Sequence, residues 1–593
     1  MSNFPKGDRA TNWGQPLQAV AGTGNLALAS TVTMGLLAGM VLALVTAVLW
    51  ILESSNPLLG FGIAVGITIA FNTLFFFLSP WLMDWSQGWL YQRRWVELND
   101  IARRSPQTAD VIRRVCAEKN LKHPRLGLIA DGNPTAFTYG TFPNSARLVV
   151  SEGLFTYLDD EEAAAVYAHE LGHIVNYDFV WMTVAATLVQ ILYLVYTLAR
   201  RMGESGSDKK KDLAQNVALV AYLFYLAGTY LLLYLSRTRE YFADRFAAQV
   251  TGDPNALSRA LVKIAYGILE EGERIPAEAA PARGQTKTAE KPPQRSALLE
   301  GTRALGIYDG RTAAGTGTAY RVAASPLEVG RVFLWDLFNP WGWWMELNST
   351  HPLTGKRIRA LSTYAEQMGI APEFDMGTVV AEGNRLDKQR LYGSFLVDVL
   401  IFQAPLVGSI VGAIAGSLSL GGGDVWMGAL GLFSGLLVGN GVGTLGRAFV
   451  MYPNFGRATE TSVMALMSDP YASPLRGQPA TLTGEIIGRG DAGSIFGSDL
   501  KLREASGMIY LRYASRFGPL GNFLFGWQQA GKLVNLSVRT QGWFRRGIAP
   551  WMDLLELHTP EKRITSHPRF WALLSGILSI GLGLFLGVAI AAS

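Results

Sequence analysis

The residues best suited to chemistry stand together in one short segment, AVYAHELGHIV, within a helical pattern. His169 and His173 are four positions apart, so a helix places both imidazole rings on one face, where they can bind the same metal ion. Glu170 lies beside them and can accept a proton from water. Nitrogen ligands at this spacing fit zinc. The segment therefore predicts a metal centre that activates water.

A catalytic zinc ion needs a third protein ligand and one open position for water. Where a metzincin carries a further glycine and histidine, this chain has Asn176 and Phe179, which excludes that class. An acid further along the chain is then the expected ligand. Glu240 and Asp244 are four apart in SRTREYFADRFAAQ, so one can bind the ion while the other orients a ligating histidine. The alternative is an ordinary charged helix whose arginines pair with these acids.

Two apolar runs separate the histidines from these acids, Phe179 to Leu198 and Val217 to Leu235. Each is long enough to cross a bilayer. An antiparallel hairpin would leave the membrane surface after His173 and return to it before Glu240. The sequence therefore predicts a metal site at the membrane surface, with ligands from both ends of one hairpin.

The composition agrees with a membrane protein, because 49% of the 593 residues are hydrophobic and only 17% are charged. We read the first apolar run as an anchor rather than a cleaved signal peptide. The single Cys116 excludes a disulfide framework and a thiolate metal cluster. The sequence shows no basic run interleaved with aromatics, which argues against nucleic acid as a partner. Up to seven membrane helices are expected, at Leu26 to Leu52, Pro57 to Met83, Phe179 to Leu198, Val217 to Leu235, Phe395 to Leu420, Val425 to Leu445 and Trp571 to Ala592.

The rest of the sequence divides the chain into soluble and membrane segments. Short strands and the HELGH helix indicate an α+β domain, and TLTGEIIG, MIYLRYAS and later segments indicate a small β domain of OB-like or SH3-like type. The expected organisation is a tail at 1–25, a transmembrane pair at 26–83, a first metallopeptidase part at 84–178, a transmembrane hairpin at 179–236, a second metallopeptidase part at 237–390 with a flexible insertion at about 272–318, a glycine-rich transmembrane pair at 391–446, the β domain at 471–560 and a last transmembrane helix at 569–592.

Glycines recur at every fourth position of the later apolar runs. Small residues on one helical face let two backbones approach closely, so we expect tight helix packing rather than a pore or channel. The positions are Gly408, Gly412, Gly416, Gly431, Gly435, Gly439, Gly443, Gly583 and Gly587.

Together, HELGHIVNYD, REYFAD, NPTAFTYG, STHPLTGKRI and the flanking hydrophobic pairs resemble the HtpX-like and CAAX-prenyl-protease-like integral-membrane zinc metallopeptidases, over roughly Leu26 to Leu361. The resemblance implies a gluzincin-type α+β domain in a polytopic α-helical membrane protein. It also implies one Zn²⁺ per chain, held by His169, His173 and Glu240. Glu170 would be the general base, and Asp244 would orient a ligand.

Two further sites follow from the same resemblance. The segment from Asn133 to Tyr139 resembles the family's edge strand, so Asn133, Ala136 and Phe137 would bind a substrate peptide as an added strand. Thr138-Tyr139 stands where relatives often carry Ala-Thr, and the alternative is a plain strand and turn. His351, in a turn before Pro352, would donate to the developing oxyanion, although a lone histidine is most often structural.

The expected function is endopeptidase action on membrane or misfolded proteins, with peptides and the lipid bilayer as partners. Alternatives are a zinc-bearing but silent scaffold, a prenyl-protein-processing peptidase, and a transporter built on the glycine-rich helices. Arg93, Arg94, Arg103 and Arg104 favour a catalytic side in the cytoplasm, whereas the loop RRMGESGSDKKKD, which should lie opposite, is also basic. The resemblance favours a cytoplasm-facing site. Neither substrate identity nor oligomeric state follows from the sequence.

Overall fold

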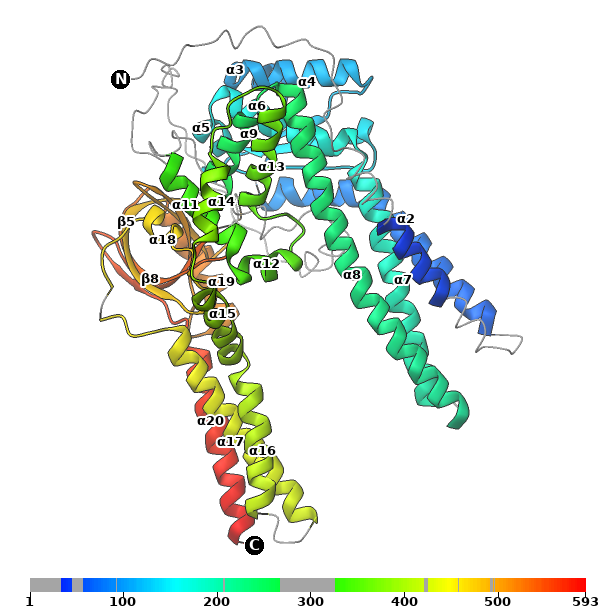
Figure 1. Cartoon of the computed structure of the whole chain (residues 1–593), viewed down its shortest axis with the longest axis vertical. Coiled ribbons are helices and arrows are strands. Elements are labelled where there is room, and N and C mark those ends of the chain that lie inside the picture. The colour runs from blue at the N-terminus through cyan, green and yellow to red at the C-terminus, as the bar shows by residue number, and fades with distance from the viewer. Residues whose placement is uncertain are drawn as a thin grey trace.

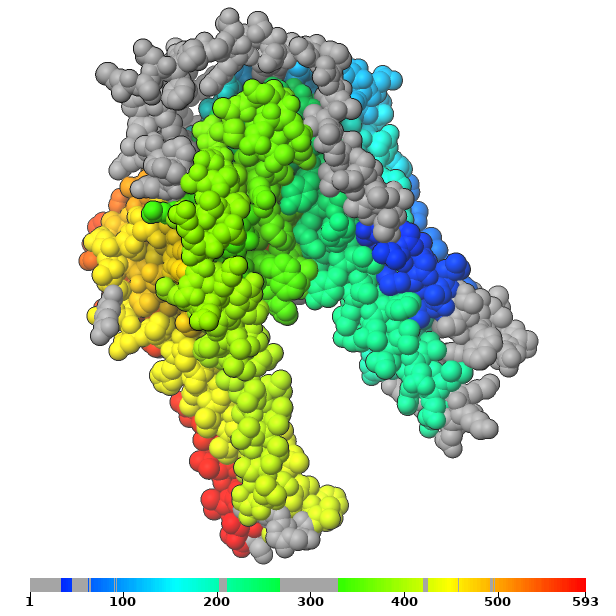
Figure 2. All heavy atoms as spheres, viewed as in Figure 1, coloured from blue at the N-terminus to red at the C-terminus, as the bar shows by residue number. Residues whose placement is uncertain are grey.

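The chain folds into a domain of helices and strands from which two groups of helices extend (Figure 1). The space-filling view shows an open wedge between the two groups (Figure 2). The tail expected at 1–25 and the insertion expected at about 272–318 lie outside the described residues. The computed structural model describes residues 33–44, 57–91, 93–205, 208–266, 326–420, 425–456, 458–490, 494 and 496–592.

The first group is built from the apolar segments on either side of the HELGH motif. It contains the helix Thr33–Leu44, α2 (Pro57–Leu90), α7 (Asp178–Ser205) and α8 (Asp208–Thr251). Buried Leu37, Val189 and Leu235 pack where these helices meet. Helix α8 is continuous through both the expected membrane run and REYFAD. The acids of that motif are therefore carried rigidly on the membrane hairpin.

A four-stranded sheet lies in the α+β domain with strand order β1-β2-β4-β3. Strands β2 and β4 are parallel, and β3 pairs antiparallel with β4 at the sheet edge. The strands are β1 (Arg93–Val96), β2 (Arg125–Ile129), β3 (Ala136–Tyr139) and β4 (Arg147–Ser151). The helices of this domain are α3 (Leu98–Arg104), α4 (Pro106–Glu118), α5 (Glu152–Tyr157), α6 (Asp160–Val175), α9 (Pro254–Leu261), α11 (Pro326–Phe338), α12 (Pro340–Leu347), α13 (Thr354–Gln367) and α14 (Met376–Asn384).

Helix α6 has strong local signals at its start. Asp159 caps it by accepting a hydrogen bond of 2.8 Å from the backbone N–H of Glu162, whose side chain accepts from the N–H of Asp159 in return. Three acids in the first turn favour the positive end of the helix dipole. The rest of α6 is buried and rich in alanine, so this helix holds its histidines firmly within the core.

The second group contains α15 (Lys388–Phe402), α16 (Ala404–Leu420), α17 (Val425–Met451) and α20 (Phe570–Ala592). The glycine faces pack as the sequence predicts: a Cβ added at Gly412 would meet the carbonyl oxygen of Gly435 at 2.1 Å, and one added at Gly416 would meet that of Gly431 at 2.0 Å. Only glycine allows α16 and α17 to approach this closely.

Five described helices are long and apolar enough to cross a membrane, or six if the bent pair α15 and α16 forms one span. This bend of 57° divides the run that the sequence predicts as a single span from Phe395 to Leu420. The first of the seven expected runs is described only at Thr33–Leu44, so its remaining residues lie outside the described part of the chain.

The C-terminal strands close into a barrel. Strand β9 pairs parallel with β7 and antiparallel with β8, and β8 pairs in turn with β5. Helix α19 (Gly518–Gln528) connects β7 to β8, and α18 (Val463–Met467) precedes the barrel. The strands are β5 (Gln478–Arg489), β6 (Leu500–Glu504), β7 (Gly507–Arg512), β8 (Ser537–Arg545), β9 (Trp551–His558) and β10 (Arg563–Thr565).

A buried ion pair joins the barrel to the α+β domain. Arg546, which follows β8, is fully buried with Nη2 3.1 Å from Asp336 Oδ1 on α11. Asp336 Oδ2 accepts hydrogen bonds from the backbone N–H of Gly355, at 2.9 Å, and from the hydroxyl of Tyr266. Because Gly355 lies in the first turn of α13, the barrel is connected through two bonds to the helix that carries Arg357.

The second helix group is also tied to the domain by a buried carboxylate. Asp398 on α15 accepts hydrogen bonds from Trp341 Nε1 on α12, at 3.1 Å, and from the Ser473 hydroxyl, at 2.7 Å, and it pairs with Arg476. Helix α12 contacts both α15 and α8. It therefore bridges the two helix groups at their junction with the α+β domain.

Candidate metal centre

The two motif histidines lie side by side on α6, as their spacing predicts. His169 and His173 are both buried, and their Nε2 atoms are 3.2 Å apart. Gly172, between them, lets α8 pass close to α6, because a Cβ at this position would meet Ala243 Cα at 3.0 Å. The glycine of HELGH thus sets the distance between the histidines and the acids on α8.

Glu240 reaches the histidines from α8, as the hairpin predicts. Its Oε1 lies 3.5 Å from His173 Nε2 and its Oε2 lies 3.6 Å from His169 Nε2. One ligand atom from each of His169, His173 and Glu240 can be chosen so that all lie within 4.8 Å of one another. The three residues come from two helices that are separated in sequence by the membrane hairpin.

These distances fit a metal ion. A tetrahedral zinc ion with bonds of about 2.0–2.1 Å separates neighbouring ligand atoms by roughly 3.3–3.5 Å. In addition, Glu240 Oε2 is buried and makes no hydrogen bond with any residue that the structure describes, although Arg357 Nη1 lies 3.2 Å from it. Arg357 pairs with this oxygen without a hydrogen bond, so the oxygen still has capacity to bind an ion. The donor set of two imidazoles and one carboxylate suits zinc.

Each histidine is held by its own carboxylate. His173 Nδ1 donates to Asp178 Oδ2 at 2.6 Å, and His169 Nδ1 lies 3.0 Å from Asp244 Oδ1. Such bonds fix the tautomer, so that Nε2 is free to bind an ion. This role is expected from the sequence for Asp244 but not for Asp178, the last residue of HELGHIVNYD. Tyr177, with φ of 57°, interrupts the helical conformation between α6 and α7 and turns Asp178 back towards His173.

The carboxylates also change the protonation of the two rings. Burial lowers the pKa of His169, but the nearby carboxylates of Asp244 and Glu240 raise it more, to about 9. For His173, burial likewise lowers the pKa, and Asp178 and Glu240 raise it above its usual value. A metal ion binding here therefore competes with protons.

Two residues from the segment after the insertion complete the site. His351 is partly exposed, and its Nε2 lies 3.4 Å from Glu240 Oε1. Arg237 on α8 holds the turn before it by donating to the carbonyl of Ser349 at 2.9 Å. Arg357 on α13 is buried and donates from Nε to Asp244 Oδ2 at 2.8 Å. Arg357 thus links both acids of α8, a contact that sequence reasoning did not assign.

Glu170 is buried on α6, next in the chain to His169. The edge-strand residues are placed differently from one another. Phe137 packs in the core with Val149, and Ala136 is only partly buried. Asn133 is buried, and its side-chain amide donates to the Gly490 carbonyl of the barrel at 3.3 Å. The side chains of Phe137 and Asn133 therefore hold the strand in place, and Ala136 remains nearer the surface.

Comparison with known proteins decides the family. Residues 102–365 match peptidase family M48. A protein named Protease HtpX homolog from Methylibium petroleiphilum is 33% identical over 219 residues, which cover 36% of this chain and 75% of that relative. This chain belongs to the HtpX-like members of peptidase family M48.

Other relatives extend the match. A Protease HtpX homolog from Acidiphilium cryptum is 35% identical over 207 residues, covering 35% of this chain and 71% of the relative. One from Thermococcus sibiricus is 28% identical over 344 residues, covering 57% of this chain and 98% of the relative. No solved structure matches this chain. The family and the candidate membrane helices identify the protein as a membrane metalloprotease.

Proposed function

We propose that this M48 peptidase is a zinc-dependent endopeptidase of gluzincin type, acting on membrane or misfolded proteins at the membrane surface. The observation that carries the proposal is the convergence of His169, His173 and Glu240 at distances that suit one ion, with a carboxylate behind each ring. Bound zinc would supply a Lewis acid that polarises the substrate carbonyl and lowers the pKa of water to about 7.

The side chains of the site have distinct roles in this proposal. Glu170, which is buried and next in the chain to His169, takes the proton from the attacking water. Asp178 and Asp244 hold the ligand rings in the correct tautomer. His351, partly exposed beside Glu240, donates a hydrogen bond to the oxyanion that forms at the substrate carbonyl.

A substrate peptide would add as a strand to β3, which stands at the edge of its sheet. Backbone hydrogen bonds carry most of the binding in this mode, so it suits substrates of varied sequence. Ala136 would contact the peptide, whereas Phe137 and Asn133 would act by fixing the strand. Their packing against the core and the barrel supports that division.

We further propose that 84–178 and 237–390 form one peptidase domain divided by the hairpin at 179–236, and that 26–83, 391–446 and 569–592 are the other membrane segments. An OB-like fold for the β domain at 471–560 is supported by its order of strands, in which β7 and β9 pair in parallel. We place the catalytic side in the cytoplasm by the family resemblance. Arg93 and Arg94, which begin the soluble domain, agree with this side, whereas the basic loop after the first helix of the hairpin does not.

The experiment measures zinc content and casein cleavage of detergent-purified wild type, Glu170→Gln and Glu240→Ala. Wild type should bind about one zinc per chain and cut casein at internal bonds. Glu170→Gln should keep its zinc and lose cleavage, whereas Glu240→Ala should lose both. Glu161→Gln, a half-buried acid on the same helix that pairs with Arg259, serves as the matched control and should behave as wild type.

The outcomes separate the possible errors. If Glu240→Ala retains zinc and activity, the third ligand lies elsewhere. If Glu170→Gln still cuts casein at the wild-type rate, Glu170 is not the base. If wild type releases only single terminal residues, as mass spectrometry of the products would show, the endopeptidase assignment is wrong.

A further inference from the structure

Helix α19 presents an apolar face to its surroundings. The exposed fractions are 69% for Phe517, 67% for Leu520, 40% for Leu524 and 46% for Trp527. A soluble barrel would normally cover such a group of large side chains or replace it with polar residues. Its exposure indicates that something apolar contacts this helix.

Helix α19 begins beside the C-terminal candidate membrane helix, α20. A Cβ built on Gly518, the first residue of α19, would lie 3.5 Å from the ring nitrogen of Trp571, in the first turn of α20. Figure 1 places α19 between the barrel and the second helix group. Helix α20 is a candidate membrane span of 23 residues, so its first turn must lie near the membrane surface. The first residue of α19 touches that turn, so this end of α19 lies near the same depth.

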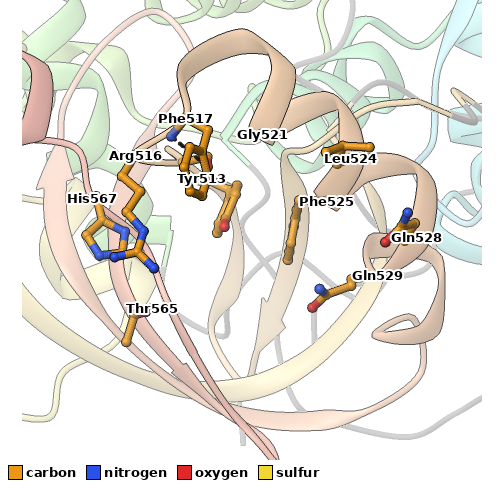
Figure 3. Close-up of a pocket in the computed structure, with 11 residues that line it drawn as sticks. Tyr513, Arg516, Phe517, Gly521, Leu524, Phe525, Gln528, Gln529, Thr565 and His567 are labelled. Atoms are coloured by element: carbon orange, nitrogen blue, oxygen red, sulfur yellow. Dashed lines mark hydrogen bonds between the residues drawn. The ribbon is translucent and has the colours of Figure 1, made fainter.

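A cavity of about 270 Å³ lies between α19 and the strand ends next to α20. Figure 3 shows Arg516 and His567 next to one another on one side of it and Leu524, Phe525 and Gln528 of α19 on the other. None of the lining residues is acidic. Within the described part of the chain, Arg516 forms no ion pair with a carboxylate. The cavity thus offers positive and polar groups beside an apolar wall.

We propose that α19 lies in the membrane–water interface and that this cavity binds the phosphate headgroup of a phospholipid of the bilayer. Arg516 and His567 donate hydrogen bonds to the phosphate, and the apolar face of α19 contacts the acyl chains. An amphipathic helix beside a membrane span commonly lies in this way, with aromatic residues at headgroup level. The barrel is then seated on the membrane by α19 as well as by its connections to α17 and α20.

The depth of α19 is tested in the full-length chain in lipid nanodiscs. Cys116→Ala removes the single native thiol, and Leu520→Cys then carries a fluorophore. Lipids spin-labelled near the headgroup should quench this fluorophore several-fold more strongly than one at Ala505→Cys. That control is an exposed turn at the other end of β7, about 17 Å along the strand. Equal or absent quenching at the two sites would overturn the proposed position.

Headgroup binding is tested by native mass spectrometry of the detergent-purified chain with added phosphatidylglycerol. Arg516→Ala and His567→Ala should each weaken retention of one lipid roughly tenfold, the effect of losing a charge-assisted hydrogen bond. Arg516→Lys should recover part of it, which a merely structural loss would not allow. Unchanged retention in both alanine variants, or equally tight binding of inorganic phosphate without lipid, would refute a phospholipid site. Both tests are independent of peptidase activity.

Discussion

The carboxylates behind the two histidines provide the sharpest test of the proposed metal centre. Asp178→Asn and Asp244→Asn keep the size and the acceptor oxygen of each side chain while removing its charge. Each should weaken zinc binding, because the negative charge makes the ring a better ligand and fixes its tautomer. The two positions sit behind different rings, so each variant tests one ligand separately.

The expected size of the effect is about 10-fold to 100-fold in zinc affinity, the usual cost of losing such a partner, or about 1.4–2.7 kcal/mol. Asp244→Asn should lie at the upper end. Its carboxylate also neutralises Arg357, whose guanidinium is buried and whose Nη1 lies 3.2 Å from Glu240 Oε2. Without Asp244, Arg357 would compete more strongly with the ion for Glu240. Asp178 also pairs with Arg239, but Arg239 donates to the carbonyl of Asn176 as well and, within the described part of the chain, forms no ion pair with Glu240. Asp178→Asn should therefore lie nearer tenfold.

The assay is competition for zinc between the detergent-purified protein and a chelating dye, at one fixed pH. Asp375→Asn is the matched control, because Asp375 caps α14 with a hydrogen bond of 2.9 Å to the N–H of Thr378 and asparagine caps a helix equally well. A loss of less than about threefold in both site variants would refute the reasoning, since it falls well below the cost expected for an orienting carboxylate.

Two further predictions concern stability, measured as thermal unfolding in detergent. Arg546→Met leaves the charge of Asp336 buried without its ion-pair partner, which should lower the free energy of unfolding by about 3–5 kcal/mol. Adding Asp336→Asn should restore part of the unfolding temperature. An unchanged unfolding temperature in Arg546→Met would contradict the proposed anchoring of the barrel. Burial lowers the pKa of Lys501 on β6 to about 7. Between pH 7 and about 10 the unfolded chain still holds this proton while the folded chain has released it, so stability should rise with pH. Lys501→Met should remove that rise, and an equal rise in both proteins would show that other groups cause it.

Most of the metal site was predictable because its signals are local. A helix fixes the relation between His169 and His173, and the lengths of two apolar runs predict the return of Glu240 to the same depth. Asp178 was missed because its approach to His173 depends on the positive φ of Tyr177, which no periodic pattern reveals. The edge strand was predicted as a segment, yet the inward direction of Phe137 depends on the partner strands.

The long-range contacts could not be predicted from the sequence for a different reason. Arg546 and Asp336 are 210 positions apart, and neither lies in a sequence motif that indicates its partner. The barrel's strands were visible from their alternation, but their closure depends on which edges pair. The bend between α15 and α16 was hidden as well, because the apolar composition continues across it and hydropathy reports length rather than direction.

The continuity of α8 explains how the proposed metal site is held at the end of the candidate membrane hairpin. Leu235 is buried in the membrane helix group, and Glu240 lies five residues further along the same helix, about 7.5 Å by helical rise. A helix does not bend easily over such a length, so the depth of the hairpin sets the height of the carboxylate relative to α6. The apolar run therefore does more than anchor the enzyme. In the proposed site it fixes Glu240 at the height of the two histidines on α6.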